Sequence, residues 1–281
     1  MRIVHLLRFL TPLFKLRRIA TETMTGSVQI LCYHDIPDSS ISDFREQMTW
    51  LARRYPFLDP DSFHAFMDGR LDLQGRHILI TFDDGFSSCR KVAEQVLAPL
   101  GIKAMFFIPV GFLDLPPGTE WREYVAQNLF SGQISENDVL ECQAPMSWDD
   151  LLWLRSQGHG IGAHTTSHCS LSNVSDKNQL SREIIDAKNR IEQVLGEEIA
   201  AMAYPFGTLQ HISKSALGLI GKHYRYCYSV VRGANVLGTK RLAIRRGTIG
   251  LDAPSAYAGF VVEDGLSWFY CFRRKKLDNL V

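Results

Sequence analysis

The sequence predicts an α/β fold built around a parallel β-sheet. Apolar runs of strand length alternate along the chain with segments whose apolar residues recur at helical spacing, an alternation typical of repeated β-α units. The chain has 281 residues, of which 46% are hydrophobic and 22% are charged. A chain of this size and composition can bury a large core in one α/β domain or in two smaller ones.

Seven apolar runs are predicted to be strands. They comprise residues 28–33, 77–82, 103–108, 160–163, 200–204, 226–230 and 241–245. Seven strands with helices between them fit either a barrel or a doubly wound sheet, and periodicity alone does not separate these architectures. The stretch 111–145, which contains Pro, Gly and Trp, is predicted to be an insertion after the third strand, where inserted loops often shape a substrate site.

Three predicted helices have recognisable features. Residues 87–100 have helical character and follow the second strand. Ser147, with Asp150 three residues later, predicts an N-cap that opens a helix ending near Gln157. A third helix, which Gly196 ends, is predicted from one apolar face: Leu180, Ile184, Ala187, Ile191 and Leu195.

Charge and cysteine content narrow the class of protein. Lys and Arg number 31 and Asp and Glu number 30, so the chain lacks the basic excess that nucleic-acid binding usually requires. Six scattered cysteines form no C-x-x-C pair, which argues against a zinc ribbon or a dense disulfide framework. We therefore predict buried free thiols in a reducing compartment.

Both ends of the chain are basic. Residues 1–26 form an amphipathic segment with apolar residues at helical spacing, namely Leu6, Leu7, Leu10, Leu13 and Phe14. No small-residue cleavage site follows, and no apolar run reaches the roughly 18 residues of a spanning helix. We expect this segment to stay uncleaved and either to contact a membrane surface or to dock on the domain. Residues 266–281 form a basic, aromatic tail, and a cytoplasmic or peripheral membrane location is favoured.

Two adjacent carboxylates follow the second predicted strand. The apolar run 78–80 leads through Thr81 and Phe82 into Asp83, Asp84 and Gly85. At the C-terminal end of a parallel strand, acidic side chains can face a pocket. Neighbouring side chains point in different directions, so one carboxylate can bind a metal while the other accepts a proton. The alternative for this motif is a tight Asp-Gly turn on the surface.

A pair of histidines follows the fourth predicted strand. His164 and His168 are four residues apart, with hydroxyl side chains between them. Two imidazoles at this spacing can bind one divalent ion if the segment makes a helical turn. The alternative is a pair of surface histidines that bind no metal.

The fifth predicted strand ends in Tyr204-Pro205-Phe206-Gly207. A turn of this kind can direct a backbone N–H towards a developing oxyanion, although it can also be an ordinary β-α connection. The three motifs lie in order, each at the predicted end of a different strand. Together they supply a metal-binding set, a base and an oxyanion donor.

This combination resembles the polysaccharide deacetylase family, known also as the NodB-homology domain or carbohydrate esterase family 4. The resemblance covers roughly residues 29–249, and the segment Cys32-Tyr33-His34-Asp35-Ile36 is similar to the Tyr-His element of the exopolysaccharide branch. It implies an α/β fold, specifically a distorted (β/α)7 barrel, over residues 27–265. It also implies an N-acetylated glycan as substrate and a divalent metal, with Zn²⁺ favoured and Co²⁺ or Ni²⁺ possible.

The resemblance implies a role for each matched residue. Asp83 corresponds to the general base, and Asp84, His164 and His168 to the metal ligands. The turn formed by Tyr204, Pro205 and Phe206 corresponds to the substrate and oxyanion element.

The sequence departs from the family pattern at two positions. The arginine that usually precedes the Pro-aromatic-Gly turn and tethers the base is absent, because residues 200–203 contain none. The resemblance to the exopolysaccharide branch makes Arg246 the preferred substitute, with Arg245 as the alternative. Neighbouring residues on a strand face opposite sides, so only one of the two can face the pocket. The late Leu-x-His motif, which carries the general acid, is also missing, so His34 is the candidate acid.

Three functions therefore remain open on the sequence. The first is a metal-dependent carbohydrate N-deacetylase acting on a polysaccharide, an oligosaccharide or a lipid-linked glycan. The second is a sugar-binding domain with impaired catalysis, which the two departures motivate. The third is a metal amidohydrolase acting on a small non-sugar amide. Aromatic residues in the insertion, Trp121, Tyr124 and Phe130, could stack on sugar rings.

Overall fold

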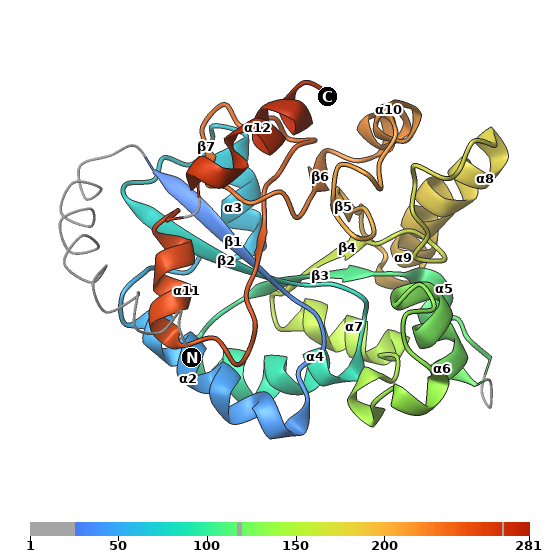
Figure 1. Cartoon of the computed structure of the whole chain (residues 1–281), viewed down its shortest axis with the longest axis horizontal. Coiled ribbons are helices and arrows are strands. Elements are labelled where there is room, and N and C mark those ends of the chain that lie inside the picture. Colours follow the sequence, from blue (N-terminus) through green and yellow to red (C-terminus); the bar gives the residue numbers. More distant parts are fainter. Residues whose placement is uncertain (1–25, 117–119, 266) are drawn as a thin grey trace.

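The computed structural model describes residues 26–116, 120–265 and 267–281, which form a curled sheet with helices on its outer side (Figure 1). The strands lie in the order β6-β5-β4-β3-β2-β1-β7, and β8 pairs with β1. Their bounds are β1 (Ser27–Tyr33), β2 (Arg76–Phe82), β3 (Ala104–Ile108), β4 (Gly160–Ala163), β5 (Ala201–Ala203), β6 (Tyr226–Tyr228), β7 (Asn235–Val236) and β8 (Gly247–Thr248).

The sheet closes into the predicted distorted barrel. Strands β1 to β6 pair in parallel with their neighbours, and β8 pairs in parallel with β1. Ile244, just before β8, makes a parallel bridge to Tyr228 at the end of β6. The segment 244–248 thus spans the space between β6 and β1. Seven parallel strands are present in the described part of the chain, and the short β7 is added antiparallel to β1.

The seventh predicted strand is wrong in position. Residues 241–245 were expected to form it, but the strand that pairs with β1 is β8, two residues further on. The side chain of Asn235 explains the difference, because its amide binds the main chain of Arg245 at both groups. Arg245 N lies 2.9 Å from Asn235 Oδ1, and Asn235 Nδ2 lies 2.9 Å from Arg245 O. A side chain here takes the place of a strand partner.

The helices surround the sheet. They are α2 (Ile41–Ala52), α3 (Pro60–Met67), α4 (Ser87–Val92), α5 (Val110–Leu113), α6 (Trp121–Tyr124), α7 (Trp148–Ser156), α8 (Lys177–Ser181), α9 (Ala187–Leu195), α10 (Lys214–His223), α11 (Ser255–Val262) and α12 (Ser267–Asp278). Helical turns extend α4 to Leu100 and join α8 to α9, which confirms the predicted helices there. Ser147 and Asp150 cap α7 reciprocally, and Gly196 ends α9 with a φ of 69°.

The core has two layers because side chains on a strand alternate between faces. The outer layer lies between the strands and the surrounding helices. The inner layer fills the barrel with side chains such as Leu79, Phe107 and Tyr228, together with Phe63 from α3. Gly162 on β4 makes room for this layer, because a Cβ at that position would lie 2.6 Å from the Phe107 ring.

The strand register brings the predicted motifs to one edge of the barrel. Tyr33 on β1 is paired with Phe82 on β2, so His34 and Asp83 leave the two strands at the same level. The Asp83 N–H donates to the Tyr33 carbonyl at 3.0 Å. On the next pair of strands, His164 N donates to Ile108 O at 2.9 Å. The carboxyl ends of the parallel strands therefore meet where the sequence places its polar motifs.

The structure describes the C-terminal end of the chain but not residues 1–25. Residues 1–25, and with them almost all of the predicted amphipathic N-terminal segment, lie outside the described residues. The C-terminal tail forms α12, which packs on the barrel through the buried Leu277 and through an ion pair between Asp278 and Arg245 at 2.8 Å. Among the described residues, no helix is both long and apolar enough to cross a membrane.

Candidate active site

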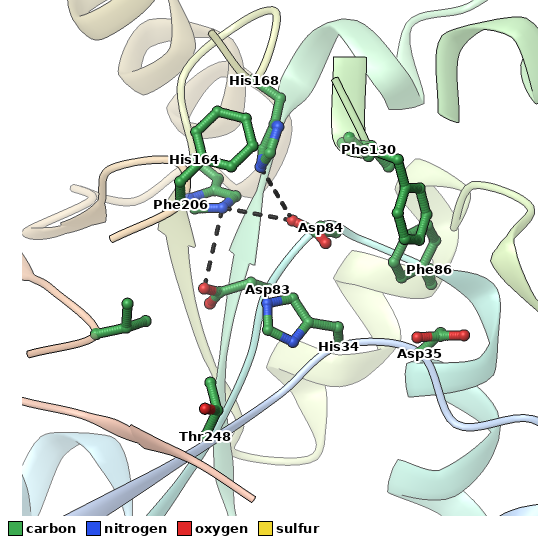
Figure 2. A pocket seen from close by; sticks show the side chains of 12 residues that line it. His34, Asp35, Asp83, Asp84, Phe86, Phe130, His164, His168, Phe206 and Thr248 are labelled. Carbon is green, nitrogen blue, oxygen red and sulfur yellow. Dashed lines mark ion pairs between the residues drawn. The ribbon is translucent and has the colours of Figure 1, made fainter. Parts of the chain in front are cut away.

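A cavity of about 360 Å³ lies at the carboxyl edge of the strands. Its lining combines acidic, imidazole and aromatic side chains (Figure 2): His34, Asp35, Asp83, Asp84, Phe86, Leu129, Phe130, His164, His168, Phe206, Val230 and Thr248. Most of the residues singled out in the sequence thus come together in one place. Arg246, Tyr204 and Pro205 are buried behind the lining instead.

Asp84, His164 and His168 form one compact group. Asp84 Oδ1 lies 3.5 Å from His164 Nε2 and 3.2 Å from His168 Nε2. All three side chains are buried, and their possible ligand atoms lie within 4.8 Å of one another. Figure 2 shows both rings directed at the same carboxylate. The segments that follow β2 and β4, the two neighbours of β3, therefore supply one group of three possible metal ligands.

Backbone carbonyls orient both imidazoles. Nδ1 of His164 lies 2.7 Å from Ala203 O, and Nδ1 of His168 lies 3.0 Å from Asn128 O. Because a carbonyl only accepts hydrogen bonds, each Nδ1 carries a proton and each Nε2 can present its lone pair towards Asp84. Metal-ligating histidines are commonly oriented in this way by a carbonyl on the other ring nitrogen.

The group fits a divalent cation. Two neutral imidazoles and a carboxylate are a ligand set used by catalytic zinc sites. Without a positive charge between them, the Nε2 and Oδ1 lone pairs would face one another in a buried site. Burial raises the pKa of Asp84, but the contacts with the His164 and His168 rings outweigh burial and hold that pKa well below its usual range. Burial lowers the pKa of His168, and the Asp84 carboxylate outweighs this and raises it. Both shifts reflect a site that favours positive charge beside Asp84.

Asp83 is held by a buried arginine. Arg246 donates two parallel hydrogen bonds to it, from Nη1 to Oδ1 at 2.6 Å and from Nη2 to Oδ2 at 2.8 Å. Arg246 is fully buried and also donates to Thr81 Oγ1 and to Ser229 O. Burial raises the pKa of Asp83, but the opposing effects, chiefly the charge and hydrogen bonds of Arg246, together lower it. Asp83 is therefore an ionised carboxylate with a fixed orientation.

The neighbouring arginine points elsewhere. Arg245 binds Asp278 of α12 at 2.8 Å, on the other side of the chain from Asp83. Of the two arginines weighed in the sequence, Arg246 is thus the one that contacts Asp83. Its catalytic importance stays a prediction.

Cys32 and His34 approach Asp83 from β1. The Cys32 thiol donates to Asp83 Oδ2 at 3.5 Å, and burial raises the pKa of this thiol, so it is protonated. The Cys32 sulfur, a ring nitrogen of His34 and a carboxylate oxygen of Asp83 lie within 4.8 Å of one another. The His34 ring lies beside Asp83 and below Asp84 in Figure 2. Among the histidines that line the cavity, it is the one outside the Asp84 group.

The turn after β5 brings one of its three predicted residues into the cavity. Phe206 lines it and packs edge-on against His168, with ring centroids 4.9 Å apart. Tyr204 is buried, and its hydroxyl donates to Gly207 O at 2.8 Å, which closes the turn. Within the described residues, the Phe206 backbone N–H donates to no protein acceptor. This N–H is thus available beside the cavity.

Backbone strain is concentrated at the site. Six described residues other than glycine have a positive φ, and four of them belong to these motifs. They are Asp84 (φ 73°), Thr165 (φ 65°), His168 (φ 59°) and Phe206 (φ 61°). Such conformations persist only where the surroundings impose them.

Glu183 is a site residue that the sequence reading missed. It is buried, and its Oε2 accepts hydrogen bonds from Thr166 N at 3.1 Å and Ser167 N at 2.9 Å. Its Oε1 accepts from Ser167 Oγ at 2.7 Å. Glu183 thus holds the loop between the two histidines. The sequence could have indicated this role. Glu183 lies three residues after Leu180, so it is an acidic residue on the predicted apolar face of that helix.

The insertion after β3 forms one wall of the cavity. Leu129 and Phe130 line it, and the adjacent Asn128 orients His168. Tyr124 instead stacks on Phe112, with ring centroids 5.0 Å apart, and it does not line the cavity. Of the three aromatic residues considered for sugar stacking, only Phe130 is therefore in position.

Comparison with known proteins agrees with this geometry. The family model for polysaccharide deacetylases matches residues 70–224, which is more than half of the chain. This match includes Asp83, Asp84, both histidines and the Phe206 turn. His34 and Arg246 lie outside it.

Similar proteins come from several bacteria. The chain is 23% identical over 189 residues to YxkH of Bacillus subtilis, a relative named as a polysaccharide deacetylase, and the match spans 65% of this chain and 57% of YxkH. IcaB from Ammonifex degensii has a similar fold, with a TM-score of 0.68 and 19% identity over 86% of this chain and 98% of IcaB.

The Streptococcus pyogenes deacetylase PplD, solved with acetate, also shares the fold. Its TM-score is 0.66 at 17% identity, and the match covers 83% of this chain and 96% of PplD. At these identities, the two solved structures establish a common architecture. The family model and the shared motifs go further, and the chain belongs to the polysaccharide deacetylase family.

Proposed function

We propose that this protein removes N-acetyl groups from an N-acetylated sugar within a polysaccharide, an oligosaccharide or a lipid-linked glycan, in a metal-dependent hydrolysis. One observation carries the proposal. A carboxylate clamped by a buried arginine, Asp83, lies beside an Asp-His-His group in a single cavity. Amide hydrolysis by a metal-activated water requires a general base next to the metal-binding residues.

Asp84, His164 and His168 would hold the divalent ion, for which Zn²⁺ is favoured and Co²⁺ or Ni²⁺ are alternatives. When bound, such an ion supplies Lewis acidity that polarises the acetamide carbonyl and lowers the pKa of water. The protein's contribution is orientation. The carbonyls of Ala203 and Asn128 hold both rings with Nε2 towards Asp84.

Asp83 would act as the general base. Its pKa lies below the usual range, so it is ionised and ready to accept a proton from the attacking water. Arg246 and Cys32 occupy its carboxylate oxygens from behind, which fixes the direction in which it accepts that proton. Water oxygen then bonds to the acetyl carbon as negative charge develops on the former carbonyl oxygen.

Two further groups would complete the reaction. The backbone N–H of Phe206 is available to donate to the developing oxyanion. His34 would give a proton to the departing nitrogen as the carbon–nitrogen bond breaks, which yields acetate and the free amino sugar. His34 is favoured because it lines the cavity, lies close to Asp83 and does not belong to the Asp84 group.

The cavity suits a single sugar residue with neighbours outside. Its volume of about 360 Å³ lies at the lower end of the range for small-molecule sites. Phe86 and Phe130 stand together on one wall (Figure 2), where an aromatic face can stack on a sugar ring. These features favour a sugar amide over a small non-sugar amide.

The test is a substrate panel with metal add-back. Acetate and free amine would be measured together on N-acetylglucosamine oligomers, a lipid-linked acetylamino sugar and a simple acetamide. We expect both products in equal amounts from a glycan, loss of activity with a chelator, and recovery with Zn²⁺, Co²⁺ or Ni²⁺.

Two variants serve as controls for this panel. Asp83→Asn should abolish product release, whereas Asp72→Asn, which changes an exposed carboxylate, should leave it unchanged. Glycan binding without product from the metal-loaded protein would support a binding domain instead. Release from acetamide alone would support a small-molecule amidohydrolase.

A further inference from the structure

Helix α12 packs on the barrel with one face and exposes large aromatic side chains on the other. The inner face packs on the barrel through the buried Leu277, and Arg274 donates to Arg232 O from the same side. The outer face carries residues spaced three and four apart, which lie along one stripe of a helix. That stripe consists of Trp268, Phe269, Phe272, Lys275 and Lys276.

The aromatic part of this stripe is exposed to an extent that a soluble surface rarely shows. Trp268 is 78% exposed, Phe269 is 69% exposed and Phe272 is 84% exposed. Leu140, Leu152, Val236 and Leu237 are the other exposed large hydrophobic residues in the described part of the chain, and each is less than half exposed. A patch of this kind marks a surface that meets another phase or molecule.

Positive charge lies next to the aromatic patch. Lys275 and Lys276 continue the same stripe, and Arg273 is also exposed. Arg273 and Lys276 line a recess of about 340 Å³ together with Tyr270 of the same helix. The recess has no acidic residue in its lining, and Val230 belongs both to it and to the active-site cavity. An anionic group in this recess would therefore meet cations and no carboxylate of its lining, next to the active-site cavity.

The positive charge of α12 distinguishes between three possible binding partners of its exposed face. The N-terminal segment is basic, with Arg8, Lys15, Arg17 and Arg18, so it would repel the cations of α12. A second copy that pairs through the same helix would bring the lysines of both copies together. An anionic phospholipid surface matches both features, because aromatic side chains settle at the headgroup level and lysines attract acidic lipids.

We propose that α12 docks on an anionic phospholipid bilayer, with Trp268, Phe269 and Phe272 in the interfacial layer and Lys275, Lys276 and Arg273 on lipid phosphates. Because the recess and the active-site cavity share Val230, docking would keep the cavity near the lipid headgroups. The inference does not depend on the chemistry of the cavity, since none of these residues lines it.

Trp268 provides a direct reporter in the full-length protein. The chain has five tryptophans, all of them in the described residues, and Trp268 is the one that is exposed. Vesicles with 30% phosphatidylglycerol and bromine-labelled acyl chains should quench part of the tryptophan emission of the wild type. In Trp268→Phe, which keeps an aromatic ring, the vesicles should still bind and this quenched part should vanish.

Charge and position are controlled with further variants. Lys275→Glu/Lys276→Glu should weaken vesicle-dependent quenching by about tenfold or more, because each cation near an acidic surface contributes about a fivefold factor in binding. Lys214→Glu/Lys222→Glu, the same charge change at exposed positions of α10, should leave it nearly unchanged.

Three results would overturn the proposal. In the first, vesicles bind but quench the wild type and Trp268→Phe equally, so that another segment makes the contact. In the second, neutral vesicles quench as well as acidic ones. In the third, the Trp268 emission shifts with protein concentration in the absence of lipid, which would identify a second copy as the occupant.

Discussion

Replacing Arg246 by methionine tests the central feature of the site, the clamp on Asp83. Arg246 is fully buried and binds both carboxylate oxygens, at 2.6 and 2.8 Å. Methionine fills much of the same space without charge, so Asp83 would be left buried with no cation. Losing one partner of a buried ion pair costs about 3–5 kcal/mol of folding free energy.

That cost is large enough to measure by thermal unfolding. For a chain of this size, 1 kcal/mol corresponds to about 2–4 °C in Tm, so Arg246→Met should lower Tm by about 6–20 °C. Asp83→Asn/Arg246→Met should recover part of the loss, because an amide is far less costly to bury alone than a carboxylate. Arg245→Met is the matched control, and its more accessible ion pair with Asp278 should cost at most about 1 kcal/mol.

The stability difference between the wild type and Arg246→Met should depend on pH. In the wild type, Arg246 depresses the pKa of Asp83, so the pair's stabilisation is present above about pH 4, the usual Asp pKa, and is lost as pH falls through the lower folded value. In Arg246→Met, burial acts without the Arg246 charge to oppose it, and that pKa rises. The variant should therefore lose stability relative to the wild type as pH rises above about 4.

The assay is thermal unfolding from pH 4 to 8 in a chelator, so that metal binding does not contribute. In the active, metal-loaded enzyme, the acidic limb of kcat/KM should also move to higher pH. A Tm difference that stays constant over this pH range, or equal losses for Arg245→Met and Arg246→Met, would refute the clamp as the cause.

Three further predictions concern the metal group and the base. His168→Ala should lower the bound metal measured by elemental analysis, and equal metal content in the variant and the wild type would reject the site. Asp83→Asn should keep metal and fold but lose about two to four orders of magnitude in kcat; retention of more than about a tenth of kcat would exclude a general base. Glu183→Leu removes the oxygens that accept the hydrogen bonds of Thr166 N–H, Ser167 N–H and Ser167 Oγ and should weaken metal binding about 10- to 100-fold, as titration calorimetry would show. Unchanged affinity would mean that the loop between the histidines holds its shape without Glu183.

Much of the site was predictable because parallel strands all end at one edge of the barrel. Asp83 and Asp84 follow β2 directly, and His164 follows β4 directly, so locating the strands also located these side chains. Strands β1 to β6 were recognisable as continuous apolar runs, since both faces of a barrel strand are buried. The missing tether could also be anticipated, because Arg245 and Arg246 stand at the end of the last predicted strand, 241–245.

The rest depended on contacts that no local pattern encodes. The last strand was misplaced because Asn235, ten residues away, binds the main chain of Arg245. Tyr204 was expected at the substrate, yet its side chain turns inward to close its own turn. Glu183 acts across 16 and 17 residues on the loop that precedes His168. In each case, the decisive contact is a hydrogen bond between a side chain and a backbone group.

The strained backbone explains why such supporting contacts matter as much as the ligands. Asp84, Thr165, His168 and Phe206 all have a positive φ, and each such residue costs on the order of 1–3 kcal/mol. Four of them cost roughly 4–12 kcal/mol, which is comparable with the whole stability of a typical domain, about 5–15 kcal/mol. The hydrogen bonds of Glu183 and the packing of β2, β4 and β5 must offset this cost before any metal binds. The ligand geometry is therefore imposed by the fold, and a divalent ion would enter a site whose carboxylate and imidazoles are already in place.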